Sequence, residues 1–80
     1  MRHLHDRLAL ARTVLSALNR ESLCRTDLEK RTVRKMGTHA SFEGMFDFLV
    51  ANGYVQKSAE KHRAPYVITE KGVKLLEGLS

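Results

Sequence analysis

Basic side chains gather in two parts of this sequence, and the chemistry they offer is anion binding. The first group lies in a predicted helix and consists of Lys30, Arg31, Arg34 and Lys35. The second group lies in and beside the polar stretch 58–65 and consists of Lys57, Lys61, His62 and Arg63. Ammonium and guanidinium groups donate charge-assisted hydrogen bonds to phosphate oxygens. Both groups are therefore candidate phosphate contacts, and the alternative for each is a solvated charged surface.

Positive charge is distributed unevenly along the chain. The 14 Lys and Arg residues and 9 Asp and Glu residues leave a net charge of +5. Residues 1–40 hold nine of the bases and four of the acids, whereas residues 41–80 hold five of each. The whole excess therefore lies in the first half. A small domain with such a distribution is a candidate for binding a polyanion, and duplex DNA is the partner that we expect.

Short polar residues mark the start of a third predicted helix. Thr38, His39 and Ser41 are candidates for base-edge or phosphate contacts, because a helix N-terminus also attracts phosphate. The outward face of the same helix carries acids and no base: Ala40, Glu43, Gly44, Asp47 and Ala51. Acids repel phosphates, although a carboxylate can accept a hydrogen bond from the cytosine amino group.

Other kinds of function have no support in the sequence. It contains no Gly-rich phosphate loop, no Cys or His set with zinc spacing and no nucleophile beside a base, so we expect no enzyme, cofactor or metal. Its single cysteine, Cys24, cannot form an internal disulfide, and the longest apolar stretch is four residues, 8–11. We therefore expect a cytoplasmic protein without a membrane span.

The first element that must support these side chains is a helix beginning near Leu4. Leu and Ala residues recur there at spacings of four and three up to Leu18, which is the helical period. A second apolar stripe widens this face, so the helix must be covered from more than one side. We expect a homodimer whose seam contains this stripe and part of the last helix: Leu10, Val14, Ala17, Leu75 and Leu79. The alternative is that the hairpin and the last helix cover the stripe within one chain.

The remaining elements follow from capping and turn signals. Thr26 and Glu29 match a capping box and predict a helix over 27–35. A third helix over 39–52 ends at an Asn-Gly pair, strands follow at 54–57 and 66–68, and Thr69 precedes a last helix. The predicted core takes apolar residues from all four helices: Leu8, Leu15, Leu28, Phe42, Phe46, Leu49 and Leu76. Residues 1–80 are thus predicted to form one mostly α domain with a small β-hairpin wing, a winged helix-turn-helix.

Two short motifs resemble a known group of proteins. The segment LVANGYV at 49–55 and the segment ITEKG at 68–72 resemble the winged helix-turn-helix domains of archaeal-type transcriptional regulators, as does the helix start at 25–28. The resemblance implies that residues 39–47 enter the DNA major groove and that residues 57–63 contact the backbone. Family members often carry Lys, Arg or Gln near the positions of Glu43 and Gly44. The acids found here favour an alternative, a protein-interaction module that kept the fold and lost groove binding.

Overall fold

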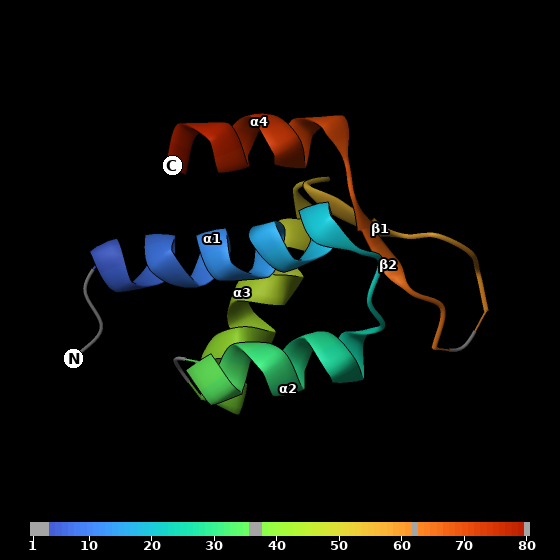
Figure 1. The fold of residues 1–80 in the computed structure, drawn as a ribbon, viewed down its shortest axis with the longest axis horizontal. Helices are drawn as coiled ribbons and strands as arrows, with labels where there is room; N and C mark the ends of the chain where they lie inside the picture. Colours follow the sequence, from blue (N-terminus) through green and yellow to red (C-terminus); the bar gives the residue numbers. More distant parts are fainter. Residues whose placement is uncertain (1–3, 36–37, 62, 80) are drawn as a thin grey trace.

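Four helices and one hairpin make up the part of the chain that the structure describes. The computed structural model describes residues 4–35, 38–61 and 63–79. The elements follow in the order α1 (Leu4–Arg20), α2 (Arg25–Lys35), α3 (His39–Ala51), β1 (Val55–Lys57), β2 (Tyr66–Ile68) and α4 (Glu70–Leu79). This is the helix, helix, helix, hairpin, helix order that the sequence predicts, and it forms a winged helix-turn-helix (Figure 1).

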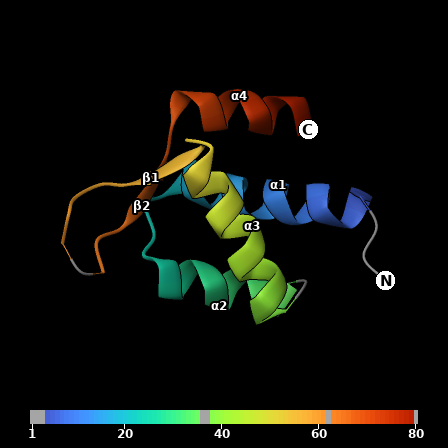
Figure 2. The same ribbon diagram turned by 180° about the vertical axis from the view of Figure 1, so that it is seen from behind.

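Helix α1 is the central element. Helix α4 lies on one side of it and α2 on the other, and α3 crosses it on the far side in Figure 1 and on the near side in Figure 2. The second apolar stripe is covered by this arrangement, because Leu10 is 7% exposed and Val14 is fully buried within one chain. Ala17, Leu75 and Leu79 are partly buried against the same core. The predicted dimer seam is therefore wrong for Leu10 and Val14, and the single-chain alternative explains the stripe.

The core matches the predicted set with one exception. Leu15, Leu28, Phe42, Phe46, Leu49 and Leu76 are all buried. Leu8 is 44% exposed, because it lies on the part of α1 where α3 and α4 leave an apolar groove instead of closing over the helix. The rings of Phe42 and Phe46 stack, and Phe46 also meets the edge of Tyr66, which joins α3 to the hairpin.

Helix α2 begins two residues earlier than predicted. The Leu28 amide donates to the Cys24 carbonyl at 3.0 Å, so the first turn is already formed at Arg25. Thr26 consequently lies inside the helix, and the predicted capping box is wrong. The Glu29 carboxylate instead forms a hydrogen bond with the ring of His39 in α3. Spacing along the chain could not indicate this partner.

Helix α3 has well-defined ends, as the sequence predicts. Thr38 is the N-cap, and its side chain accepts a hydrogen bond from the Ser41 amide. At the other end Gly53 has φ 78°, a left-handed conformation that favours glycine. The Tyr54 amide donates to the Leu49 carbonyl and the Gly53 amide to the Val50 carbonyl, which together form a Schellman motif.

The hairpin and α4 complete the domain. Strands β1 and β2 are antiparallel, with Val55 opposite Ile68, and Leu23 adds an isolated bridge to Tyr66. Thr69 caps α4 by accepting from the Gly72 amide, and its hydroxyl also reaches the carbonyls of Gly53 and Tyr54. This cap ties the start of α4 to the end of α3, so the base of the wing is held by both helices.

Candidate nucleic-acid interface

The outward face of α3 is exposed, and its acids have a partner that the sequence analysis missed. Arg25 extends from the start of α2, with its guanidinium nitrogens 3.8 Å from Glu43 Oε1 and 3.9 Å from Asp47 Oδ1. The same guanidinium lies over the Phe46 ring, 5.3 Å from its centroid. No sequence spacing could reveal this contact, because it joins two helices.

The pairing of Arg25 with the acids lessens the repulsion that α3 would present to phosphates. The two carboxylates are 60% and 71% exposed, and exposed ion pairs of this kind stabilise a protein by about 0–1 kcal/mol. Arg25 can therefore exchange these carboxylates for a phosphate at little cost.

The predicted polar residues at the start of α3 are close together and already bonded. Thr38 Oγ1 donates to Ser41 Oγ at 3.1 Å as well as accepting from the Ser41 amide. His39 Nδ1 lies 2.7 Å from Glu29 Oε2, and its side chain is 74% exposed. These residues thus cap α3 and connect it to α2. Thr38 and His39 remain exposed and are therefore accessible to a ligand.

The wing presents its bases on an exposed loop. Lys57, Lys61 and Arg63 are all exposed, and the loop extends away from the helices in both Figure 1 and Figure 2. The loop is closed by the Ser58 amide, which donates to the Pro65 carbonyl, and Lys57 Nζ donates to the Lys61 carbonyl. Arg63 has φ 63°, a left-handed conformation for a non-glycine residue. His62 lies outside the described residues.

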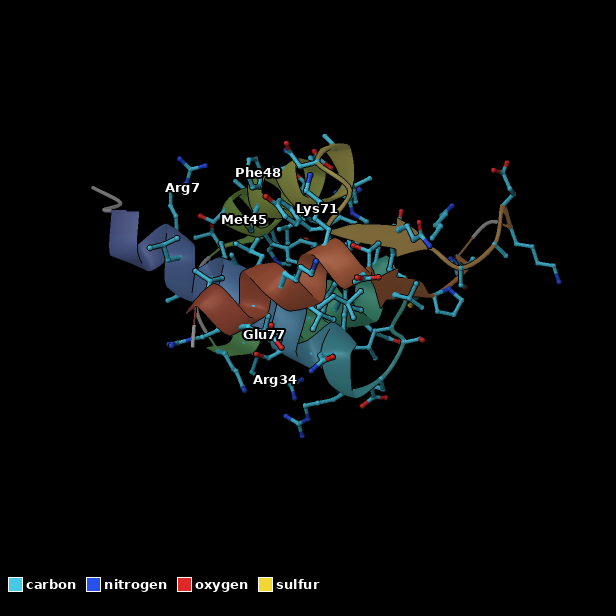
Figure 3. The ribbon with its side chains drawn as sticks, turned by 90° about the horizontal axis from the view of Figure 1, so that it is seen from above. Arg7, Arg34, Met45, Phe48, Lys71 and Glu77 are labelled. Carbon is cyan, nitrogen blue, oxygen red and sulfur yellow. The ribbon has the colours of Figure 1, made fainter. Side chains whose placement is uncertain are left out.

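The bases of α2 are not brought to the face of α3. All four bases of the predicted group are exposed, and three of them, Arg31, Arg34 and Lys35, line an open cleft between α1 and α2. Arg31 pairs there with Glu21 at 3.2 Å. Figure 3 shows Arg34 on the side of the molecule opposite Phe48 of α3. Arg34 therefore lies away from the Phe48 side of α3.

An apolar groove of about 350 Å³ lies between α1, α3 and α4. Leu8 and Phe48 are large apolar residues that remain exposed there, at 44% and 46%. The groove is lined by side chains of all three helices and of the turn after α3: Arg7, Leu8, Ala11, Met45, Phe48, Tyr54, Leu75 and Leu79. Figure 3 shows Arg7, Met45 and Phe48 on the same side of the molecule.

Two other features are absent from the part of the chain that the structure describes. It has no group of three or more His, Cys, Asp and Glu residues that could hold a metal ion. Among the same residues, no helix has both the length and the apolar character that crossing a membrane requires.

Comparison with known proteins identifies the fold. No protein-family model matches the chain, and no curated protein matches it. Among solved structures, the crystal structure of SSV1 F-93 is similar, with a TM-score of 0.69 and 24% sequence identity. The match covers 88% of this chain and 79% of SSV1 F-93. Together with the four helices and the two-stranded wing, this likeness establishes a winged-helix fold for the chain.

Proposed function

We propose that this chain is a DNA-binding protein without enzymatic activity, which contacts duplex DNA through α3, the start of α2 and the wing. The observation that carries the proposal is the basic wing extending from a winged-helix body, beside an exposed α3 whose acids are held by Arg25. We further propose that it acts as a cytoplasmic transcriptional regulator of the archaeal type, in keeping with the motifs at 49–55 and 68–72.

Phosphate contacts dominate the binding that we propose. Lys57, Lys61 and Arg63 supply them from the wing, and Arg25 adds one when it leaves its carboxylates. Recognition of the DNA sequence is weak, because the exposed face of α3 carries the acids Glu43 and Asp47 and no Lys or Arg side chain. Affinity should then fall with salt, with a log–log slope of about −0.9 for each phosphate neutralised.

The test is a titration of labelled duplex DNA at about 50 mM and about 200 mM salt, the range over which counterion release changes affinity strongly. Lys61→Ala and Arg63→Ala should weaken binding to all sequences and each flatten the slope by about one unit. Lys74→Ala is the matched control, because Lys74 is an exposed base on α4 that pairs with Glu70. Absence of salt-dependent binding by the wild-type chain would refute the DNA proposal.

A homodimer is part of the proposal, with the seam moved to the apolar groove. Leu8 and Phe48 project from the border of the groove, next to its apolar recess. In an isologous dimer one patch must supply both the projecting side chains and the recess that receives them. A second copy would also double the number of phosphate contacts. Sedimentation should show a dimer for the wild-type chain and a monomer for Phe48→Glu. A wild-type chain that sediments as a monomer at high micromolar concentration would rule out the second copy.

The same groove favours a second candidate function, a protein-interaction module. Exposed apolar side chains beside an apolar recess are typical of protein docking sites. This candidate applies if the chain sediments as a monomer and binds no duplex DNA, with Phe48 and Leu8 as its contact residues. The two experiments above therefore separate the candidates.

A further inference from the structure

Two rows of cationic side chains face each other across the cleft between α1 and α2. Arg12 and Arg20 lie eight residues apart on α1 with Ser16 between them, a spacing that places all three on one helical face. Arg31 and Lys35 lie four residues apart on α2, and Arg34 is beside them. The cleft has a volume of about 460 Å³, which is within the range of small-molecule sites.

The charge of this cleft is far from balanced. Its lining among the described residues contains five bases and a single acid, Glu21, which is already paired with Arg31. Arg12, Arg20, Arg34 and Lys35 make no ion pair with any residue that the structure describes. The helix dipole favours the bases in the last turns of α1 and α2, but it does not account for Arg12 or Arg31, which lie earlier in their helices.

One residue that lines the cleft also has a buried hydroxyl without a partner among the described residues. Thr32 lines the cleft and is 1% exposed, and its Oγ1 has no hydrogen-bond partner among the described residues. Leaving a buried donor unpaired is unfavourable, so such groups in native proteins are usually bonded to a neighbour, a water or a ligand. An anionic oxygen bound in the cleft would supply the acceptor once the Thr32 side chain rotates toward it.

From the facing cations, the cleft volume and the unpaired hydroxyl, we infer that the α1–α2 cleft binds a small molecule carrying several phosphate charges. Guanidinium groups on both walls match the geometry of phosphate oxygens. Figure 3 shows Arg34 of the cleft on the side of the molecule opposite Phe48 of α3. None of the bases of the cleft is among the proposed DNA contacts, so the inference goes beyond them. Binding of an oligophosphate would also link α1 to α2 and give the domain a response to a small ligand.

The test uses inorganic tripolyphosphate, titrated by calorimetry into the full chain at about 50 mM salt, where screening of exposed charges is limited. We expect saturable binding of one tripolyphosphate per chain. The double variant Arg12→Gln/Arg31→Gln should bind at least about tenfold more weakly, because it removes one charge-assisted contact from each wall. Arg34→Gln/Lys35→Gln is a second such variant, and circular dichroism checks that both remain folded. A parallel titration with a nucleoside triphosphate shows whether the ligand is a free oligophosphate, when the affinities are equal, or a nucleotide, when the nucleotide binds more tightly.

The matched control is the wing variant Lys61→Gln/Arg63→Gln, which loses the same charge elsewhere. It should keep its affinity for tripolyphosphate and lose affinity for duplex DNA, whereas the cleft variants should do the reverse. Equal loss of tripolyphosphate binding in the wing and cleft variants, or no saturable binding by the wild-type chain, would overturn the inference. So would a loss of DNA affinity in the cleft variants, because DNA would then occupy the cleft. If the wing variant keeps its DNA affinity, the proposed function fails and the cleft inference stands on its own titration.

Discussion

Replacing Gly72 by alanine should destabilise this protein, although alanine is the better helix former. Gly72 is a buried residue in the first turn of α4. A Cβ atom added there would lie well inside van der Waals contact with the Tyr54 carbonyl oxygen, and 2.7 Å from Ile68 Cγ1, where ordinary contacts begin at about 3.4 Å. The carbonyl is backbone, so it cannot rotate away as a flexible side chain can. Helix α4 must move instead.

The size of the effect follows from what that movement disturbs. Overpacking a close contact costs about 1–3 kcal/mol. The Tyr54 carbonyl also accepts from the Thr69 amide and the Thr69 hydroxyl, and each of these bonds contributes about 1 kcal/mol if it is lost. Against this, alanine gains about 1 kcal/mol in helix propensity. With both bonds lost we therefore expect a net loss of about 2–4 kcal/mol. Each kcal/mol lowers the Tm of so small a domain by about 4–8 °C.

The assay is urea and thermal unfolding followed by circular dichroism, at one protein concentration for all variants. Gly44→Ala is the control, because Gly44 is also helical and an added Cβ there meets no atom within 4 Å. This control should be more stable than wild type by about 0.5–1 kcal/mol. Equal stability of Gly72→Ala and Gly44→Ala would contradict the close approach of α4 to the Tyr54 carbonyl. It would also contradict the attachment of the wing to α3 and α4 described above.

Three further predictions concern the core, a cap and the α3 face. Leu15→Ala should cost about 2–5 kcal/mol because Leu15 is fully buried, whereas Leu8→Ala should cost no more than about 1 kcal/mol; equal costs in urea unfolding would contradict the burial described. Thr38→Ala should cost about 0.5–2 kcal/mol through loss of the α3 N-cap, and an unchanged unfolding midpoint would show that the cap contributes nothing. Glu43→Gln should raise affinity for duplex DNA and steepen its salt slope by up to about one unit, because it removes a charge that repels phosphate and leaves Arg25 paired with Asp47 alone; Glu77→Gln on α4 is the control, and equal gains in both variants would argue against α3 as the DNA face.

Local rules were sufficient for most element boundaries. The Thr38 cap, the Gly53 exit from α3 and the Thr69 start of α4 each depend on residues within a few positions of one another, so their chemistry is readable along the chain. The start of α2 was predicted wrongly because a local pattern was overruled by a contact between helices. Thr26 and Glu29 have the spacing of a capping box, but Glu29 is used by His39 of another helix.

The candidate sites depended much more on tertiary structure. Helical period identified a wide apolar stripe on α1, but it could not say whether α4 and the hairpin or a second copy covers Leu10 and Val14. Charge counts likewise identified the bases of α2 without indicating which neighbour they face. Arg25 and its two acids lie about twenty residues apart, and only the packing of α2 against α3 brings them together.

The order of the elements, most of the core and the presence of two basic groups can be predicted from the sequence, because period, capping and charge are properties of neighbouring residues. Where the charged side chains lie relative to one another depends instead on the packing of the helices. The crossing of α1 and α2 turns Arg31, Arg34 and Lys35 into a cleft with Arg12 and Arg20, and the packing of α2 on α3 sets Arg25 against Glu43 and Asp47. The directions of these side chains follow from how helices pack, which depends on the whole core and not on any local spacing.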